Sequence, residues 1–447
     1  MPLDRIVEPV AYGPLPDRDN YWRTTAEPPA VPRLEGAQEA EFAVLGAGFT
    51  GLSAALRLAE AGADVAVVDA HGPGWGASGR NGGFCCLGGA VLGSATIARR
   101  YGRSAARDWA NAERAAVDLV AETLETRGID ADRHSDGETL LAHAASRRPD
   151  LKERGEEIRA LYGLDATLHG KDELAQLGMA SPEFHGAVTV PIGFALNPLK
   201  YATGLAGSAR TAGARLYGDS PVTRIARETG AFVLKTSTGE LRARKLLIAT
   251  NGYSSEDVPA WLRGRYLPTQ SNILVTRPLT GDELAAQGWT SRQMCYDTRY
   301  HLHYFRLMPD NRMLFGVRGR VRSTREVWAQ TRRQARADFD RIFPAWAHVE
   351  TPHFWQGLLC LSPKLAPYVG PGGAHGAYAA LAYHGNGVAM ASLSGRLMAD
   401  LALDRAPAIP RVMSAPMGRF PLGRHRRWLL WGMWHLHRLQ DMARGRA

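Results

Sequence analysis

The chain of 447 residues is long enough for about three units of ~150 residues, and its apolar content of 45% suffices for large cores. Four cysteines are too few for a disulfide framework, and the first residues lack the apolar run of a signal peptide, so we expect a cytoplasmic protein. Most of the net charge of +10 comes from residues 405–447, where nine arginines accompany one acid, so the rest is nearly neutral. No apolar stretch of about 18 residues predicts a transmembrane helix.

Residues 1–40 are rich in proline and show little apolar periodicity, which predicts an arm lying over the surface. An apolar run from Phe42 then predicts a buried strand, followed by Gly46, Gly48 and Gly51. These glycines supply a tight turn, close approach to a pyrophosphate and close packing of helix on strand. A helix with one apolar face leads to a second strand ending in Asp69, where a carboxylate is needed for ribose hydroxyls. This order predicts a bound dinucleotide.

Further along, the pattern predicts helices over 104–128 and 151–163, each stopping at a glycine, and a helix from Asn197 to Gly213. Short strands are expected around Val222, over 232–236 and over 246–250. Residues 297–320 alternate like a hairpin with its turn at 309–311. Dinucleotide-type segments near 42–92, 197–252 and 365–403 predict a discontinuous dinucleotide domain with a second domain inserted in its gaps.

A second glycine-rich loop, residues 72–83, follows the acidic strand end directly. Its glycines, with Ser78, Arg80 and Asn81, make a flexible loop rich in donors that can wrap phosphates and reach the edge of a ring system. A nicotinamide enzyme would not need it. The G-x-S-x-G pattern of a serine hydrolase requires glycine where Arg80 stands, so that class is excluded.

Six segments in this order resemble the flavin-dependent amine and D-amino-acid oxidase-like (DAO) oxidoreductases, and more closely their gamma-glutamylputrescine oxidoreductase-like branch. The segments are Gly46–Asp69, the 74–83 loop, Asn197–Tyr201, Ala249–Tyr253, His303–Arg306 with Leu314–Gly316, and Tyr383–Val388. The resemblance implies an α/β fold (α+β overall) with FAD as cofactor in an extended pose. It further implies a Rossmann-like ββα FAD-binding domain with an inserted antiparallel sheet roofing the flavin.

On this resemblance the domains would be an N-terminal arm (1–40), an FAD-binding domain (41–92, 190–255 and 356–405), a substrate domain (93–189 and 256–355) and a basic aromatic tail (406–447). The residues expected to contact FAD are Gly46, Gly48, Gly51, Asp69, Ser78, Arg80, Asn81, Gly82, Gly83, Val222, Thr250, Gly252, Gly385, Asn386, Gly387 and Val388.

Two departures from the family pattern bear on the substrate. Relatives that oxidise free amino acids often carry Trp-x-Gly-Leu-Arg-Pro, whose arginine clamps a carboxylate, but this chain reads Trp355-Gln-Gly-Leu-Leu-Cys360. A free α-amino acid is therefore not expected. Many relatives also have a histidine where Asn386 stands, although asparagine can still donate a hydrogen bond to the flavin edge.

Tyr304, Arg306 and Trp355 are the main substrate-pocket candidates, because an aromatic wall excludes water and an arginine could hold a distal carboxylate. Tyr253 and His384 are further candidates.

Cys85 and Cys86 would point to opposite faces of a strand, so one should lie near the flavin, and a plain buried thiol is favoured over a covalent flavin link. His301 and His303 lack a third ligand at suitable spacing, so no metal is expected.

The implied reaction is oxidation of an amine C–N bond by hydride transfer to flavin N5, with hydrolysis of the imine to an aldehyde or ketone. The amine would be a polyamine, a gamma-glutamyl-polyamine or an N-substituted amino acid, and the electrons would pass to oxygen or another acceptor. No catalytic base is identified. The alternative is a flavoprotein acting mainly through its tail at a membrane or partner surface. For the tail itself, packing on the body is favoured over membrane contact, and nucleic acid is not expected as a partner.

Overall fold

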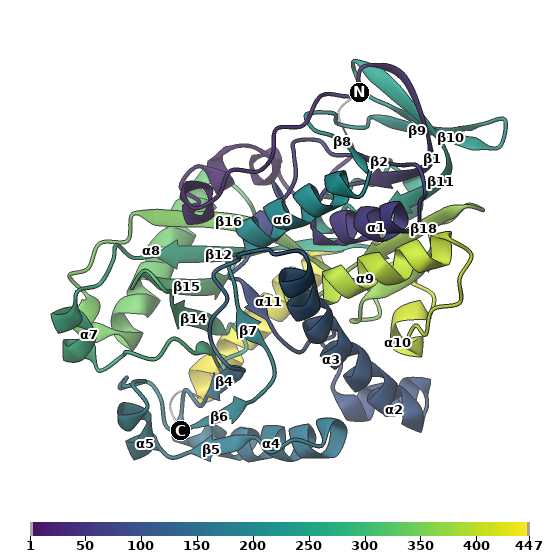
Figure 1. Ribbon diagram of the computed structural model, residues 1–447. Helices are drawn as coiled ribbons and strands as arrows, with labels where there is room; N and C mark the ends of the chain where they lie inside the picture. The colour runs from purple at the N-terminus through teal and green to yellow at the C-terminus, as the bar shows by residue number, and fades with distance from the viewer. Residues whose placement is uncertain (1–2, 445–447) are drawn as a thin grey trace.

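The computed structural model describes residues 3–444, with side chains up to residue 441. Within these residues the chain forms two eight-stranded sheets and a small two-stranded sheet of β3 (Phe84–Cys85) and β7 (Phe194–Ala195). The two large sheets lie side by side, with helices packed around them (Figure 1). The predicted mixed α/β fold is confirmed.

The first sheet has a parallel centre. Its strand order is β17-β18-β11-β1-β2-β8, and the β9–β10 hairpin pairs with β11. Because both faces of the centre are covered, β2 is buried at every residue, as its apolar sequence predicts. The strands are β1 (Gly36–Leu45), β2 (Val65–Val68), β8 (Arg215–Tyr217), β9 (Arg224–Glu228), β10 (Ala231–Lys235), β11 (Gly239–Ile248), β17 (Tyr368–Pro371) and β18 (Ala377–Leu381).

Two of these strands differ from the sequence-based expectation. β1 begins at Gly36, so residues 36–40, which we assigned to the N-terminal arm, pair with β11. The short strand predicted around Val222 is β9, which begins two residues later at Arg224 and whose ladder with β10 starts where Thr223 N donates to Lys235 O at 2.8 Å. Pro221, just before Val222, has no backbone N–H to donate.

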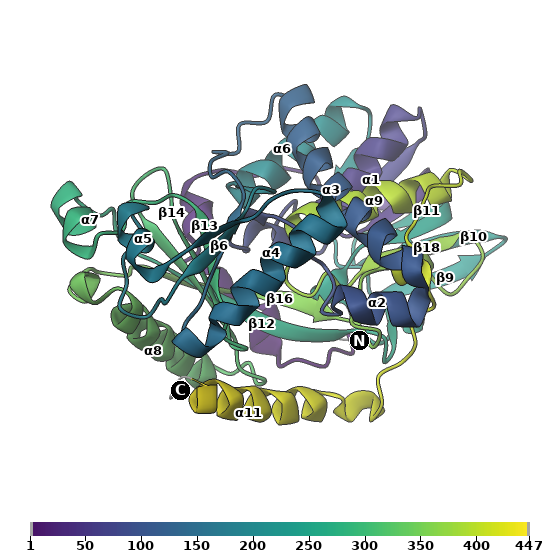
Figure 2. The same ribbon diagram turned by 90° about the horizontal axis from the view of Figure 1, so that it is seen from below.

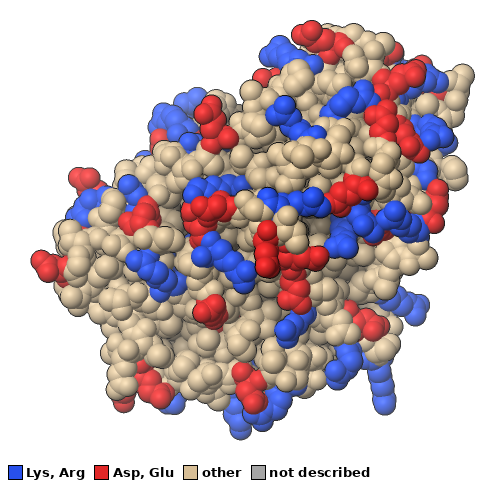
Figure 3. Space-filling model, in the orientation of Figure 1, with Lys and Arg blue, Asp and Glu red and all other residues tan. Residues whose placement is uncertain are grey.

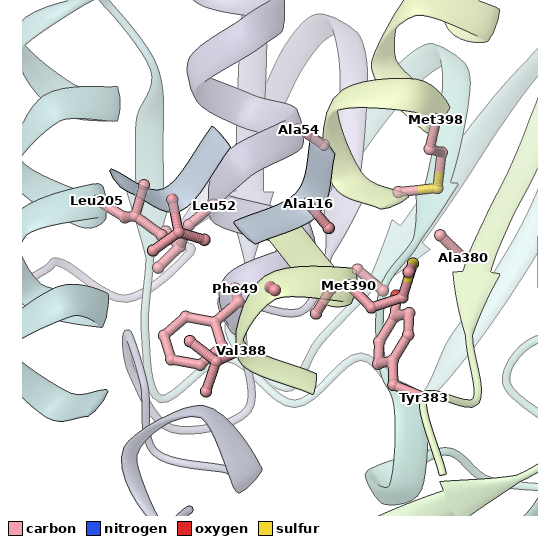
Figure 4. Close-up of a cluster of buried hydrophobic side chains, with 14 of the residues drawn as sticks. Phe49, Leu52, Ala54, Ala116, Leu205, Ala380, Tyr383, Val388, Met390 and Met398 are labelled. Carbon is pink, nitrogen blue, oxygen red and sulfur yellow. The ribbon is translucent and has the colours of Figure 1, made fainter. Parts of the chain in front are cut away.

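Four helices build the core beside this sheet: α1 (Phe49–Glu60), α3 (Arg103–Thr126), α6 (Pro198–Thr211) and α9 (Gly387–Ala402). Figure 4 shows Phe49 and Leu52 of α1 in this cluster with Val388 and Met390 of α9. The helices α1 and α9 approach closely because Gly395 has no side chain; a Cβ there would lie 2.2 Å from Thr50 O. The core thus fixes the start of α9 against the β1–α1 turn.

The second sheet has the order β16-β12-β15-β14-β13-β4-β6-β5 and is antiparallel except for the β13–β4 pair. Helix α8 (Arg325–Ile342) covers it through a cluster that includes Phe305, Phe315, Phe339 and Trp346. The strands are β4 (Glu138–Leu141), β5 (Thr167–His169), β6 (Ala187–Val190), β12 (Leu267–Val275), β13 (Met294–Asp297), β14 (His303–Leu307), β15 (Met313–Arg318) and β16 (His353–Leu361).

The helices predicted over 104–128 and 151–163 are confirmed as α3 and α4 (Arg148–Tyr162), and the predicted hairpin is β14–β15. Shorter helices complete the described chain: α2 (Ser94–Tyr101), α5 (Lys171–Gln176), α7 (Gly281–Gln287) and α10 (Arg411–Ser414). On the face shown in Figure 3, Lys and Arg are interspersed with Asp and Glu, as expected for a body with little net charge.

The tail ends in α11 (Arg427–Arg444), which runs along the outside of the molecule in Figure 2. Just before it, Arg426 is fully buried and forms a bidentate ion pair with Glu256, at 2.6 and 3.2 Å. Residues 445–447, including the tail arginine Arg446, lie outside the described residues. None of the helices within residues 3–444 is both long and apolar enough to cross a membrane.

Candidate active site

A cavity of about 540 Å³ lies between the two large sheets. The β1–α1 turn, the loop after β2 and the start of α9 form one part of its wall. Strands β12, β14, β15 and β16 form another, and side chains of α3 and α4 close the far part. Of the 21 residues proposed from the sequence for cofactor or substrate, the cavity brings most together and leaves out Gly51, Gly83, Gly252, Arg306 and Trp355.

The β1–α1 turn is shaped by its glycines. Gly46 has a φ of +108°, and a Cβ there would lie 2.9 Å from Ala249 O. Gly48 lines the cavity, with Ser78 Oγ only 2.9 Å from its Cβ position. We expected Gly51 to contact the cofactor, but it does not face the cavity, because its Cβ position is 1.8 Å from Gly46 O. It serves the close packing of helix on strand.

Asp69 lies at the end of β2 and lines the cavity. Its Oδ2 accepts a hydrogen bond from Ala47 N at 2.7 Å, and its Oδ1 accepts one from His71 N at 2.9 Å. Burial raises the pKa of Asp69, and these two N–H donors oppose the rise. The carboxylate therefore holds the β1–α1 turn in place beside the cavity.

Arg80 is the most constrained side chain of the 74–83 loop. Its guanidinium stacks on Trp75 at 4.0 Å, and its Nε donates to Trp75 O at 2.8 Å. Its Nη2 is buried and has no hydrogen-bond partner within residues 3–441. A buried donor without an acceptor costs about 1–3 kcal/mol, so Arg80 is suited to an acceptor supplied by a bound group.

The rest of this loop is held by Asn81, which donates to Ala77 O and Ser78 O and accepts from Gly83 N. Gly82 lines the cavity, but Gly83 does not, since its Cβ position is 1.8 Å from Leu196 O.

The start of α9 supplies Gly385, Asn386, Gly387 and Val388 to the cavity wall. Asn386 donates through Nδ2 to Leu87 O at 2.7 Å, so its amide fixes the chain after β3. Because the helix begins here, its N-terminal backbone N–H groups give this edge a partial positive charge.

His384 also lines the cavity, but both of its ring nitrogens are engaged. Nε2 accepts from Ser362 N at 3.2 Å, so Nδ1 carries the proton and donates to Gly89 O at 2.9 Å. Burial lowers the pKa of His384 to about 4, which keeps the ring neutral near pH 7. His384 is thus a structural residue of the wall.

The comparisons with known proteins agree with this geometry. A sequence model of the family described as FAD dependent oxidoreductase (DAO) matches residues 41–401. This chain belongs to the DAO family. It is 32% identical over 413 residues to the probable oxidoreductase OrdL of Rhizobium meliloti strain 1021, covering 90% of this chain and 92% of that protein. It is 31% identical to the gamma-glutamylputrescine oxidoreductase of Escherichia coli K12, covering 86% and 88%.

Among solved structures, glycine oxidase from Geobacillus kaustophilus superposes with a TM-score of 0.70 at 20% identity, covering 85% of this chain and all of that one. The protein is an FAD-dependent oxidoreductase. The cavity fits FAD on its own features, since the Gly48 turn leaves room for a pyrophosphate and Arg80 keeps a buried donor free.

In this DAO-family cavity, Gly46, Gly48 and Thr250 would border the pyrophosphate, while Asp69 and Val222 would border the adenosine. Ser78, Arg80, Asn81 and Gly82 would run beside the isoalloxazine, and Gly385–Val388 would meet its pyrimidine edge. Gly252 stands behind this wall, because its Cβ position is 2.6 Å from Leu358 O.

Two of the residues proposed from the sequence for the substrate, Tyr304 and Tyr253, line the cavity. The ring of Tyr304 lies over Gly316, whose Cβ position would be 2.0 Å from its Cζ, and its hydroxyl is 2.9 Å from Ser271 Oγ. Tyr253 accepts from Leu358 N at 3.3 Å and contacts Trp75 edge-on.

Arg306 does not reach the cavity. Its guanidinium is covered by the glycine loop and donates to Gly82 O at 2.9 Å and Leu196 O at 2.8 Å, with His134 Nε2 at 2.8 Å. These bonds tie β14 to that loop, and the buried guanidinium does not face the cavity in which a substrate carboxylate would lie.

Trp355 is also covered, in this case by the N-terminal arm. Trp22 packs against it edge-on at 6.2 Å, and its Nε1 donates to Arg80 O at 2.9 Å. On β16 the cavity is lined instead by residues 357–360, which follow Trp355.

Arg318, the last residue of β15, is a cationic side chain that lines the cavity. Its Nη1 lies 3.2 Å from the Cβ position of Gly385, at the edge where the flavin is expected. Within residues 3–441 its guanidinium has no hydrogen bond or ion pair. Burial lowers the pKa of Arg318, and the nearby Tyr304 opposes this. Sequence reasoning missed this residue.

The far wall of the cavity is acidic and was not predicted. Glu113 of α3 accepts from Tyr162 OH at 2.6 Å, and burial raises the pKa of Glu113 to about 7. Arg154 Nη1 lies 2.8 Å from Glu157 Oε2, and its Nη2 lies 3.7 Å from Glu138 Oε1. This wall therefore carries three carboxylates and one arginine, which contacts Glu138 and Glu157 but not Glu113.

Cys86 connects the start of α9 to the acidic wall. Its Sγ lies 3.8 Å from Asn386 Nδ2, and burial, with the neighbouring Glu138, raises the pKa of Cys86 well above its usual range. Cys85 faces the core instead, so the two cysteines do point to opposite sides. A thiol with a raised pKa is a poor nucleophile, so Cys86 acts as a packed wall residue.

Proposed function

We propose that this protein oxidises the C–N bond of an amine that carries a second cationic group, such as a polyamine or a gamma-glutamyl-polyamine. The product imine would be hydrolysed to an aldehyde, and the electrons would pass to oxygen or another acceptor. The observation that carries this proposal is the excess of carboxylates on the far wall of the flavin cavity.

The charges of that wall support a cationic partner. Arg154 compensates one of the three carboxylates, while the hydrogen bond from Tyr162 leaves Glu113 without a cation. A buried carboxylate without a cation is costly, and an ammonium group supplies both a charge and three N–H donors. The contacts from Asn386 through Cys86 to Glu138 link this wall to the start of α9, where we expect the flavin edge, so one extended substrate would reach both.

The reacting nitrogen must be neutral, because a protonated amine cannot stabilise the positive charge that develops on its carbon. FAD, when bound, supplies the acceptor for the two electrons and the hydrogen of that carbon. The residues of this chain orient and dehydrate the substrate: Tyr304 covers the cavity from β14, and the acidic wall holds the remote ammonium. His384 is no base, since its Nε2 already accepts a hydrogen bond and its Nδ1 carries a proton.

The test is anaerobic mixing of the purified holoprotein with diamines, polyamines, their gamma-glutamyl conjugates and N-methyl amino acids, followed by flavin absorbance. Bleaching by an amine with a second cationic group supports the proposal. No bleaching by any amine would contradict it and favour a flavoprotein that acts through its tail. Readmission of air then shows whether oxygen reoxidises the flavin.

Replacing Glu113 with Gln is expected to raise KM for a diamine by about 10- to 100-fold, since charge-assisted hydrogen bonds contribute about 1.5–3 kcal/mol. Because the pKa of Glu113 is about 7, its ionised fraction rises with pH, so wild-type binding should strengthen as pH rises through 7. The Glu113→Gln variant should lose this step, measured as KM against pH. A control variant is Glu122→Gln, on the exposed side of the same helix. Equal pH profiles for wild type and Glu113→Gln would contradict the assignment.

Arg318 favours a second candidate substrate, an N-substituted amino acid, because a cation without a partner can hold a carboxylate. On that reading, Arg318→Ala should raise KM for a carboxylate-bearing amine by about 10- to 100-fold and leave a plain diamine much less affected. Steady-state kinetics with both substrates separates the readings. Equal losses on both would assign Arg318 to the flavin edge rather than to the substrate.

A further inference from the structure

Helix α11 turns one face onto the body and the opposite face to solvent. On the inner face, His437 stacks on Tyr300 at 4.9 Å and Trp434 packs against His301 at 5.2 Å. Asp441 accepts hydrogen bonds from the backbone N–H groups of Tyr300 and His301 at 2.9 and 3.0 Å. These contacts recur at the helical spacing of residues 434, 437 and 441, so they fix which face of α11 turns outward.

The outward face is strongly apolar. Trp428, Trp431 and Leu439 are 66%, 54% and 65% exposed, and Leu436 is 53% exposed. The rings of Trp428 and Trp431 lie 6.4 Å apart, and His435 continues the row 4.4 Å from Trp431. At 1.5 Å per residue this row extends for roughly 16 Å along the helix. Exposed aromatic residues in one row mark a surface that another body covers.

The charges near this apolar row indicate what kind of surface would cover it. Arg438 of α11 and Arg419 earlier in the tail are exposed, while Asp441, the one acid of α11 in the described chain, is turned onto the body. A second copy of this chain would bring identical arginines against these across a two-fold axis, because such an interface pairs a patch with itself. An anionic surface meets no such repulsion.

We propose that the outward face of α11 docks on the surface of a membrane that contains anionic lipids. Tryptophan and leucine side chains enter the boundary between headgroups and acyl chains, and arginines contact the lipid phosphates, as in interfacial amphipathic helices. The helix would lie along the membrane surface; as noted above, no helix within residues 3–444 is both long and apolar enough to cross a membrane. The inner contacts hold the enzyme body against this helix.

The test is co-sedimentation of the full-length holoprotein with vesicles of phosphatidylcholine and phosphatidylglycerol, compared with phosphatidylcholine alone. We expect binding to the anionic vesicles that weakens as salt screens the charges. The double variant Trp428→Ser/Trp431→Ser should bind at least about tenfold more weakly, and Arg438→Gln roughly fivefold more weakly. Both should keep wild-type amine oxidation and melting temperature, because these side chains do not contact the body core.

The matched control is Leu168→Ser on β5, which removes an apolar side chain of similar exposure, 51%, from another surface. It should bind vesicles like the wild type. The proposal is overturned if the intact protein does not sediment with anionic vesicles at low salt, or if the control loses binding as strongly as the double variant. It is also overturned if light scattering shows a dimer that the double variant abolishes, since a second copy would then cover this face.

Discussion

A valine at Gly48 is expected to abolish retention of FAD. The Cβ position of Gly48 is 2.9 Å from Ser78 Oγ, so any side chain must enter the part of the cavity where the pyrophosphate would lie. Wild-type protein should be yellow and release FAD, not FMN, on acid treatment. The Gly48→Val variant should be colourless, as measured by visible absorbance and by the FAD content of the acid extract.

The matched control is Gly207→Val on α6, where an added Cβ meets nothing within 4 Å. It should retain FAD. Circular dichroism of both variants shows whether loss of FAD accompanies loss of fold. Stoichiometric FAD in Gly48→Val would show that the β1–α1 turn does not hold the pyrophosphate.

Removing the buried cation of the tail is expected to destabilise the protein strongly. Arg426→Ala leaves the Glu256 carboxylate buried without a counter-ion, and breaking such a pair costs about 3–5 kcal/mol. Denaturant titration should show this loss, with a lower melting temperature. The exposed pair Arg424–Asp4 offers the comparison, since Arg424→Ala should change stability by no more than about 1 kcal/mol.

A second variant separates the lost charge balance from lost packing. Combining Arg426→Met with Glu256→Gln removes both charges and keeps most of the volume, so it should recover much of the stability. If Arg426→Ala and Arg424→Ala have equally small effects, the tail contributes little to folding. That result would contradict the packing of residues 423–441 on the body.

The sequence predicted the dinucleotide turn well because its signals are local. A strand, three spaced glycines, a helix and Asp69 follow one another within one supersecondary unit, and each residue type has one physical reason to be there. Gly51 shows the limit of that reasoning, since the pattern could not tell a glycine that faces the ligand from one that packs helix on strand.

The substrate wall was harder to predict because it depends on which segments cover which faces. Tyr304 and Arg306 are two residues apart on β14 and were predicted to share a face. The glycine loop covers Arg306 but leaves Tyr304 exposed to the cavity. Had the predicted return strand been extended by one residue beyond Val317, it would have included Arg318, at the position opposite Leu302. Glu113 also left a signal, as a carboxylate among the apolar positions of α3, where Trp109, Ala116 and Val120 are buried. The role of Glu113 could not be predicted from this position, because it depends on Tyr162 of α4, which is remote in sequence.

The chain order of the first sheet has a consequence for biosynthesis. Its neighbouring strands β1, β11 and β18 come from the beginning, the middle and the end of the chain, and α9 follows β18. A growing polypeptide therefore lacks the part of the cavity wall formed by the start of α9 until residues 377–402 have left the ribosome. Until then the apolar face of α1 has no α9 to pack against and is a target for chaperones. FAD can be captured only after β18 and α9 have been synthesised, so chains that stop before β18 should emerge without the flavin and be degraded.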